Sequence, residues 1–181
     1  MRGDSKFAIL MAAVLALLGY CFVISAYSAS KPIESRQVKS ALYPLAYFAG
    51  DWECSGKFDS SGKTIDAHQH FEPALDGSWI FFRHDDTPPF NYHAFAEWGW
   101  DSTGKDFVMT VQDSAGGVRV FHSIGWNSTQ LQWDGDALGA ASVPSQRFVF
   151  ERIDDRHFKV SYFIRKSGDW SRVDSSTCNK Q

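Results

Sequence analysis

From residue 52 to residue 178, short segments rich in aromatic and aliphatic residues alternate with clusters of turn-forming residues. We expect each of these ten segments to form a strand, because the clusters between them contain the Gly, Asp, Asn, Ser and Pro residues typical of turns. The segments cover residues 52–58, 64–72, 79–83, 92–100, 107–112, 118–126, 130–133, 146–153, 157–165 and 170–178. Many short strands joined by tight turns predict an all-β domain in which the strands follow one another in an antiparallel, up-and-down order.

A sheet of this size must protect its two edge strands, because exposed edges promote aggregation. Closing the sheet into a barrel is the simplest solution, and a sandwich of two sheets is the alternative. The aromatic content of 15%, with 7 Trp and 15 Phe, suits such a β-rich domain. Pro88 and Pro89 exclude a central strand between residues 85 and 91, so this stretch is expected to form a loop at the mouth of the barrel.

Residues 1–28 have the pattern of an export signal. Arg2 and Lys6 precede an apolar run over residues 7–24, and Ala26 and Ser28 supply small side chains at the −3 and −1 positions for cleavage before Ala29. The alternative is an uncleaved anchor over residues 7–27, since about 18 apolar residues can span a bilayer. The chain is therefore expected to be periplasmic or secreted, with a membrane as partner only if that anchor is kept.

The sequence divides into three parts: a signal peptide over 1–28, a lead-in with a short helix over 29–44, and one barrel domain over 45–181. Apolar residues recur at roughly helical spacing in the lead-in, and Pro44 ends the helix. The net charge is −3 without any cluster of basic residues. This charge pattern argues against a nucleic-acid partner.

Two cysteines, Cys54 and Cys178, remain once Cys21 is assigned to the signal peptide. Exported proteins commonly oxidise such pairs to disulfides. The two residues lie in the first and last predicted strands, which are neighbours in a closed barrel. The sequence therefore predicts a Cys54–Cys178 disulfide that ties the barrel closure, with two independent buried thiols as the alternative.

The first predicted strand begins with a Gly-x-Trp motif at residues 50–52, and the third begins with Gly-Ser-Trp at 77–79. With these motifs, residues 42–178 resemble the calycin superfamily, and most closely its exported bacterial lipocalin-like barrels. The resemblance implies a barrel of about ten strands in which Trp52 plugs the closed end. It also implies that an arginine from a late strand packs across that indole, with Arg172 as the candidate and Arg165 as the alternative.

The haem-binding nitrobindins are ten-stranded relatives within the same superfamily. A haem site of their kind needs an inward histidine on a late strand, and the sequence around His157 does not match that motif. No cofactor is therefore predicted, and haem stays a minor alternative.

In a barrel of this size, inward and outward side chains alternate and the lumen can hold one small ligand. Taking the apolar face of each strand as the inner face gives aromatic walls and a few polar anchors. The predicted ligand-binding residues are Gln69, Trp79, Phe81, Arg83, Trp98, Trp100, His122 and Trp126. A buried Arg83 would have to meet a carboxylate, water or an anionic ligand, and its alternative is to reach solvent at the strand end. His122 has its own alternative, a core histidine with satisfied hydrogen bonds.

These residues predict a non-catalytic protein that binds a small hydrophobic or amphipathic molecule, with an acidic group if Arg83 anchors it. The first alternative is an isomerase or hydrolase of the same fold that uses His122 as acid or base and Arg83 for charge stabilisation. The second is a structural envelope protein whose barrel is filled by its own side chains. No catalytic residues are assigned, because the sequence has no nucleophile elbow and no phosphate-binding glycine loop.

His68, His70 and Glu72 lie on one face of the second predicted strand. Two histidines and a carboxylate could bind a divalent metal. The same face carries Thr64 and Asp66, so it is interpreted as the solvated outer face of the barrel, and no metal site is predicted.

Overall fold

The structure of the protein is a computed structural model that describes residues 41–137 and 144–181. The predicted signal peptide, the alternative anchor and most of the lead-in helix lie outside the described residues. None of the helices within the described ranges is long and apolar enough to cross a membrane.

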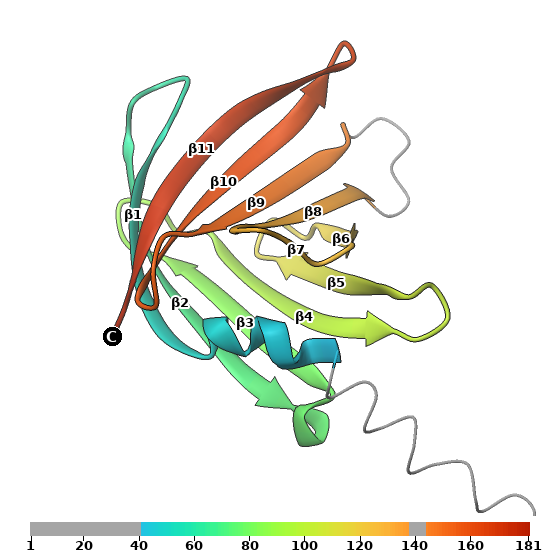
Figure 1. The fold of residues 1–181 in the computed structure, drawn as a ribbon. Coiled ribbons are helices and arrows are strands. Elements are labelled where there is room, and N and C mark those ends of the chain that lie inside the picture. The colour runs from blue at the N-terminus through green and yellow to red at the C-terminus, as the bar shows by residue number, and fades with distance from the viewer. Residues whose placement is uncertain (1–40, 138–143) are drawn as a thin grey trace, which may run out of the picture. The chain divides into compact units, whose positions relative to one another are not determined.

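The described residues form one antiparallel sheet of eleven strands and two short 3-10 helices (Figure 1). The helices are η1 (Tyr43–Phe48) and η2 (Leu75–Gly77). The strands are β1 (Gly50–Phe58), β2 (Thr64–Ala74), β3 (Trp79–Asp86), β4 (His93–Asp101), β5 (Asp106–Asp113), β6 (Val118–Ser123), β7 (Trp126–Asn127), β8 (Gln130–Ala137), β9 (Gln146–Arg152), β10 (His157–Lys166) and β11 (Asp169–Lys180).

Ten of these strands form a closed barrel. β1 pairs with both β2 and β11, and the additional pairing of β6 with β8 joins the two ends of the sheet. β7 is a two-residue strand that pairs only with β8. The closed ten-stranded antiparallel barrel confirms the predicted fold class and its up-and-down strand order, in preference to the two-sheet sandwich.

Each predicted segment corresponds to a strand, with one division, two longer extensions, and shifts of one or two residues at other strand ends. β3 continues to Asp86, so Asp85 and Asp86 belong to this strand and not to the loop predicted over residues 85–91. The sixth segment divides into β6 and β7 at Gly125, which has a φ of 95° that favours glycine. The seventh segment is longer than predicted, because β8 continues to Ala137 to pair with β6.

Cys54 and Cys178 face each other across β1 and β11 and form the predicted disulfide. Their Cα atoms are 4.0 Å apart and 124 residues separate them in the sequence. The bond therefore joins the first strand of the barrel to the last.

The helix η1 lies across one end of the barrel (Figure 1). Leu45 and Phe48 are fully buried there. The Phe48 ring lies within 5.3–5.6 Å, between centroids, of aromatic rings from several strands of the barrel wall: Phe71, Trp98, Trp126, Phe150 and Phe158. Trp52 is buried beside it and donates a hydrogen bond from Nε1 to the Phe48 carbonyl over 2.7 Å. This end of the barrel is therefore filled by aromatic side chains.

The prediction that Arg172 packs across Trp52 is wrong. The cation over the indole is Lys180, whose Nζ lies 5.2 Å from the ring centroid. Lys180 is the β11 residue opposite Trp52, whereas Arg172 lies toward the other end of the barrel and pairs with Asp59 over 2.9 Å. Arg165 does not reach Trp52 either, since it donates to the Gly168 carbonyl in the turn between β10 and β11.

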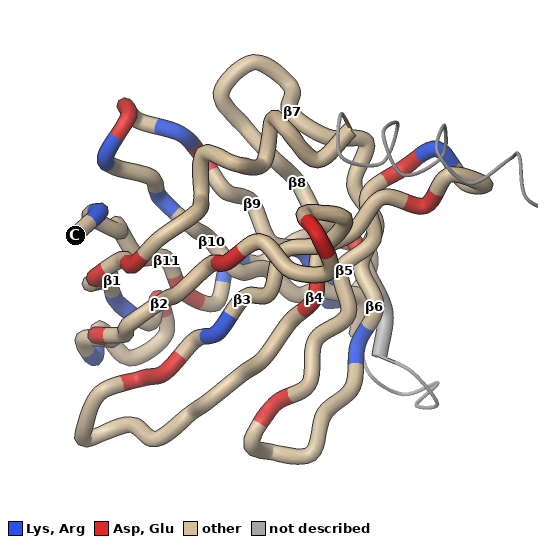
Figure 2. Tube along the Cα trace, turned by 90° about the horizontal axis from the view of Figure 1, so that it is seen from below, with Lys and Arg blue, Asp and Glu red and all other residues tan. Residues whose placement is uncertain are grey.

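Acidic and basic positions are interspersed along the strands of the barrel (Figure 2). An acidic pair, Asp85 and Asp86, ends β3 where the chain leaves the barrel toward the loop that carries Pro88 and Pro89. One carboxylate of this pair points outward and the other inward, which matters for the cavity described next.

Candidate functional site

The end of the barrel opposite η1 encloses a cavity of about 430 Å³. Most of its wall is apolar, with contributions from β3, β5, β9 and β10. Large apolar lining residues include Phe58, Phe82, Met109, Phe148, Phe150 and Val160. Phe90, Asn91 and Tyr92 also line it, so the loop predicted to lie at the barrel mouth borders the cavity.

On β4, the residue that lines the cavity is small and the residue at the packed end is large. Ala94 lines the cavity, whereas Trp98 is fully buried outside its wall. Trp98 packs against Trp133 there, with 5.1 Å between the ring centroids. Alanine at position 94 therefore contributes space to the cavity.

A β-bulge in β11 brings two consecutive residues to the cavity wall. Tyr162 of β10 pairs with Asp174, and the next residue, Phe163, pairs with Arg172, so Val173 is the extra residue. Bulges of this kind change the direction of a side chain relative to the regular alternation. As a result, Val173 and Asp174 both line the cavity although they are consecutive.

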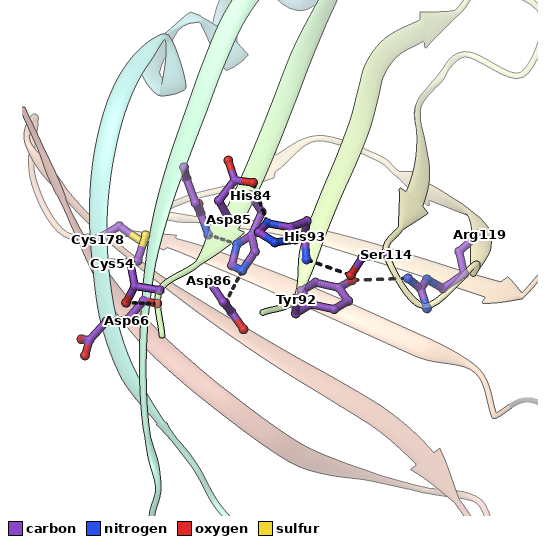
Figure 3. A network of polar contacts seen from close by, with 12 residues as sticks. Cys54, Asp66, His84, Asp85, Asp86, Tyr92, His93, Ser114, Arg119 and Cys178 are labelled. Carbon is purple, nitrogen blue, oxygen red and sulfur yellow. Dashed lines mark hydrogen bonds and ion pairs between the residues drawn. A yellow bond between two sulfur atoms is a disulfide. The ribbon is translucent and has the colours of Figure 1, made fainter. Parts of the chain in front are cut away.

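A short polar chain crosses from β2 to β3 inside the cavity (Figure 3). His84 lies with Nδ1 3.1 Å from Gln69 Nε2 and with Nε2 2.8 Å from Asp86 Oδ1. Both ring nitrogens of His84 therefore have a polar side-chain partner inside the cavity.

The Gln69 side chain has one atom left without a partner. Gln69 is 4% exposed, and its Oε1 has no hydrogen-bond partner among the described residues. The Nε1 atoms of Trp98 and Trp133 are also buried without a hydrogen-bond partner among the described residues, but neither indole lines the cavity. A buried acceptor without a partner costs about 1–3 kcal/mol, so a ligand that donates to Gln69 Oε1 would recover that energy.

Burial raises the pKa of Asp174 from 3.8 to about 6. The nearby carboxylates of Asp59 and Asp86 raise the pKa of Asp174 further, while His84 and Arg172 oppose the shift. The carboxyl group of Asp174 is therefore poorly hydrated on the cavity wall. It lies close enough to His84 and Asp86 on β3 for these groups to affect its pKa.

Arg119 is the arginine of the cavity wall, and a carboxylate already neutralises it. It forms an ion pair with Asp113, whose side chain is 2% exposed. Arg119 also donates to the Tyr92 hydroxyl over 3.4 Å (Figure 3). Burial raises the pKa values of Tyr92 and Tyr162, and the charge of Arg119 acts against both shifts. Both hydroxyls therefore stay protonated and can donate hydrogen bonds.

Of the eight predicted ligand-binding residues, Gln69 lines the cavity. Trp98 lies beneath it in the core. Trp100 and Trp126 also belong to the aromatic packing and not to the cavity wall, since Trp100 contacts Phe107 and Trp126 stacks on Phe48.

The predicted inward orientation of Trp79, Phe81 and Arg83 on β3 is wrong. The inward residues of this strand are Ile80, Phe82, His84 and Asp86. The Arg83 side chain is 69% exposed and pairs with Asp85 over 2.6 Å. Phe81 packs on Phe95, with 5.5 Å between ring centroids, and the Trp79 ring lies over Gly99. The first four residues of β3 are all large and apolar, so apolarity could not identify its inner face.

The predicted orientation of β6 is wrong for the same reason. His122 was expected to face the lumen, but its side chain is 56% exposed and pairs with Asp106 over 2.8 Å. The inward residues are Arg119, Phe121 and Ser123. Valines at 118 and 120 made the outer face of β6 resemble an inner face.

Four polar residues of the cavity wall were not predicted from the sequence: His84, Asp86, Arg119 and Asp174. Strand pairing could have identified the first two, because Gln69 on β2 was correctly placed inside and lies opposite His84. Residues directly opposite each other in a sheet share a face. Regular alternation along β11, from the buried Cys178 through Ser176, also places Asp174 inside.

On the outer face of β2, His68 lies 2.8 Å from Glu53 and His70 lies 2.6 Å from Asp51. Each distance joins histidine Nδ1 to a carboxylate oxygen on β1. Within the described ranges, no group of three or more His, Cys, Asp or Glu side chains has the geometry of a metal site.

No protein-family model and no curated protein sequence matches the chain. Among solved structures, a de novo designed fluorescence-activating β-barrel covers 75% of this chain and 94% of its own, at 14% identity and a TM-score of 0.41. A redesigned β-barrel bound to the small molecule DFHBI covers 74% of this chain and 99% of its own, at 9% identity and a TM-score of 0.39. With TM-scores below 0.5, these likenesses carry no information about the ligand of this chain.

Proposed function

We propose that this chain binds a small, largely apolar molecule in its barrel cavity and does not transform it. The observation that supports this most directly is the cavity itself, about 430 Å³ in volume, with apolar walls and a polar cluster on one side. Small-molecule sites in proteins commonly measure about 300–1,000 Å³ and combine apolar walls with a few polar groups. Burial of the apolar part of the ligand would contribute about 25 cal/mol per Å².

We also propose that the protein is exported and related to the lipocalins. The pattern of residues 1–28 supports export, and the Gly-x-Trp motif at the start of β1, with Trp52 buried beneath η1, supports the relationship. Removal of the signal can be tested by N-terminal sequencing of the protein made by its natural host. A mature chain beginning at Ala29 is expected, and a chain that still carries residues 7–27 would favour the anchor.

A matched pair of substitutions tests binding in the cavity. Val111 lines the cavity on β5, whereas Val118 on β6 is 44% exposed and does not line it. The neutral probe N-phenylnaphthylamine should fluoresce when bound to the wild-type protein. Val111→Trp should weaken that binding at least about tenfold by filling the space, and Val118→Trp should leave it unchanged. Equal probe binding by both variants, or no binding by the wild type, would overturn the proposal.

The enzyme alternative has no support in the form that uses His122 and Arg83, since neither residue lines the cavity. A second candidate function rests on a different pair: His84, hydrogen-bonded to Asp86, faces the same cavity as Asp174. Positioned histidines and carboxylates of this kind can transfer protons to and from a bound substrate. The cavity itself counts against the alternative in which side chains fill the whole barrel.

The enzyme candidate predicts that a cell extract incubated with the protein loses one metabolite and gains its product. His84→Asn should abolish this conversion while leaving N-phenylnaphthylamine binding intact. The same conversion by the wild type and the variant would exclude His84 as the proton-transfer group.

A further inference from the structure

The described cavity wall carries two carboxylates, one imidazole and one guanidinium group, and the guanidinium group is already paired. Asp86, Asp174, His84 and Arg119 are the residues with charged or chargeable imidazole, carboxylate or guanidinium groups on its wall. Arg119 is neutralised by the buried Asp113. The described part of the cavity wall therefore holds two carboxylates, Asp86 and Asp174, that have no lysine or arginine partner on it.

Asp86 is a deeply buried member of this pair. Its side chain is 7% exposed and its contact with a neighbouring side chain is the one to His84 Nε2, at 2.8 Å. This contact with the imidazole uses one of the acceptor positions of the carboxylate. A carboxylate can accept about four hydrogen bonds, so Asp86 keeps acceptor capacity toward the cavity.

Gln69 provides the second, independent observation. Its Oε1 is a buried acceptor that has no hydrogen-bond partner among the described residues. Gln69 on β2 lies directly opposite His84 on β3, so both residues face the cavity. Asp174, which lines the cavity on the same face of β11 as Ser176, adds a third acceptor. Among the described residues of the wall there are these three acceptors and neither a lysine nor an unpaired arginine, so this wall is complementary to a cationic group that donates hydrogen bonds.

We propose, on the basis of the proposed binding function, that the ligand is an amphiphile with a protonated amine at one end. Its ammonium group is received by Asp86, Asp174 and Gln69 Oε1, and its apolar body lies against Phe82, Phe148 and Phe150. A primary ammonium group has three donors and no acceptor, which matches a wall of acceptors. A carboxylate-ended ligand would instead face Asp86 and Asp174 and be repelled.

The test compares three probes with the same apolar chain: decylamine, decanol and decanoic acid. Binding is measured by calorimetry at neutral pH with the full chain in its oxidised form, at concentrations below micelle formation. Decylamine should bind at least about tenfold more tightly than decanoic acid, with decanol between them. Comparable binding of all three probes would overturn the amine proposal but leave the binding function standing. Failure of all three to bind would count against the binding function itself.

Substitutions identify the groups responsible. Asp174→Asn and Asp86→Asn should each lower the decylamine affinity about five- to tenfold and leave the decanol affinity within about twofold. Asp155→Asn, whose side chain is 90% exposed in the turn between β9 and β10, is the matched control and should change neither. Decanol binding and the near-ultraviolet circular dichroism of each variant show that its cavity is intact. Unchanged decylamine affinity in both cavity variants would overturn the proposal.

The wild-type protein offers a test that needs no substitution. The decylamine affinity should rise as the pH passes upward through about 6, where Asp174 ionises. The groups that face Asp174 are His84 and Asp86 from β3, Asp59 from the turn after β1, Arg172 from β11 and Tyr162 from β10. Because Asp174→Asn leaves all of them in place, the loss of this pH dependence in the variant assigns it to Asp174. The same pH dependence in the variant would contradict the assignment.

Discussion

The Nε2 atom of His84 lies 2.8 Å from Oδ1 of Asp86, inside a cavity whose other walls are mostly apolar. The two residues are two positions apart on β3 and therefore share its inner face. Burying polar groups costs free energy that hydrogen bonds must offset. An aliphatic pair at these two positions would stabilise the fold without that cost. The presence of His84 and Asp86 in the cavity points to ligand recognition.

Asp174 should reduce the stability of the free protein at neutral pH. Its pKa in the folded state, about 6, lies above the ordinary 3.8, so the folded state binds the proton more tightly than the unfolded chain does. The stability that comes from the protonated carboxyl is fully present below pH 3.8 and is lost as the pH rises through about 6. Above that pH, Asp174→Asn should increase the free energy of unfolding by roughly 1–2 kcal/mol, a value discounted for partial exposure.

Urea denaturation of the wild type and Asp174→Asn at a pH above 6 and at a pH below 3.8 checks this sign. The difference between the two proteins should shrink at the lower pH. A variant that is less stable than the wild type at the higher pH would show that the carboxylate is favourably solvated. If Asp174 lowers the stability of the fold and strengthens amine binding, it contributes to function at a cost in stability, as binding and catalytic residues often do.

Removal of the Cys54–Cys178 disulfide should lower stability substantially. The bond closes a loop of 124 residues, for which the loop-entropy model gives about 4–5 kcal/mol. Unfolding by urea can be compared with and without a reducing agent, and with Cys54→Ala/Cys178→Ala as the matched variant. A loss below about 1 kcal/mol would mean that strand pairing alone sets the barrel closure.

Phe48 should be the most important single side chain of η1. It is fully buried among the rings of Phe71, Trp98 and Phe158, so Phe48→Ala should cost about 3–5 kcal/mol of unfolding free energy. Tyr43→Ala, in the same helix at a position 80% exposed, should change stability by less than about 0.5 kcal/mol. Similar losses for both variants would contradict the role of Phe48 as the residue that closes this end.

Lys180 and Arg172 offer a direct comparison of two basic residues on β11. Lys180→Ala removes the cation over Trp52 and a 3.3 Å hydrogen bond to the Tyr47 carbonyl, and should cost about 1 kcal/mol. Arg172→Ala removes an exposed ion pair with Asp59 and should cost less than about 0.5 kcal/mol. Thermal unfolding of the two variants compares these losses of stability. A larger loss for Arg172→Ala than for Lys180→Ala would contradict the assignment of Lys180 as the residue that supports the indole.

The number and order of the strands could be predicted because turn residues mark each strand end, and turn chemistry is local. The disulfide could be predicted because a closed barrel makes its first and last strands neighbours. On β2, Ile65, Ala67, Gln69 and Phe71 alternate with polar residues, so the inner face was evident and is confirmed.

The cavity wall was harder to predict, because orientation on β3 and β6 depends on pairing with other strands. A shift of one residue exchanges the two faces of a strand. Phe82 faces inward because β3 pairs it with Phe71, and Arg119 faces inward because the β5–β6 hairpin pairs it with Val111. Asp174 shares its face with Cys178, but the residues between them are all Ser or Thr, so no apolar alternation marks that face. Residue type alone therefore placed Arg83 and His122 in the lumen, although both lie outside.

Native mass spectrometry tests the central proposal, that the cavity holds a small molecule, most directly. The protein would be purified without denaturation from cells that naturally produce it, with a denatured portion of the same sample as control. The account predicts a reproducible additional mass that is lost on denaturation, together with a polypeptide two hydrogens lighter than the reduced chain. The additional mass should be absent from Val111→Trp and present in Val118→Trp. A bare polypeptide mass in every native sample would contradict the account.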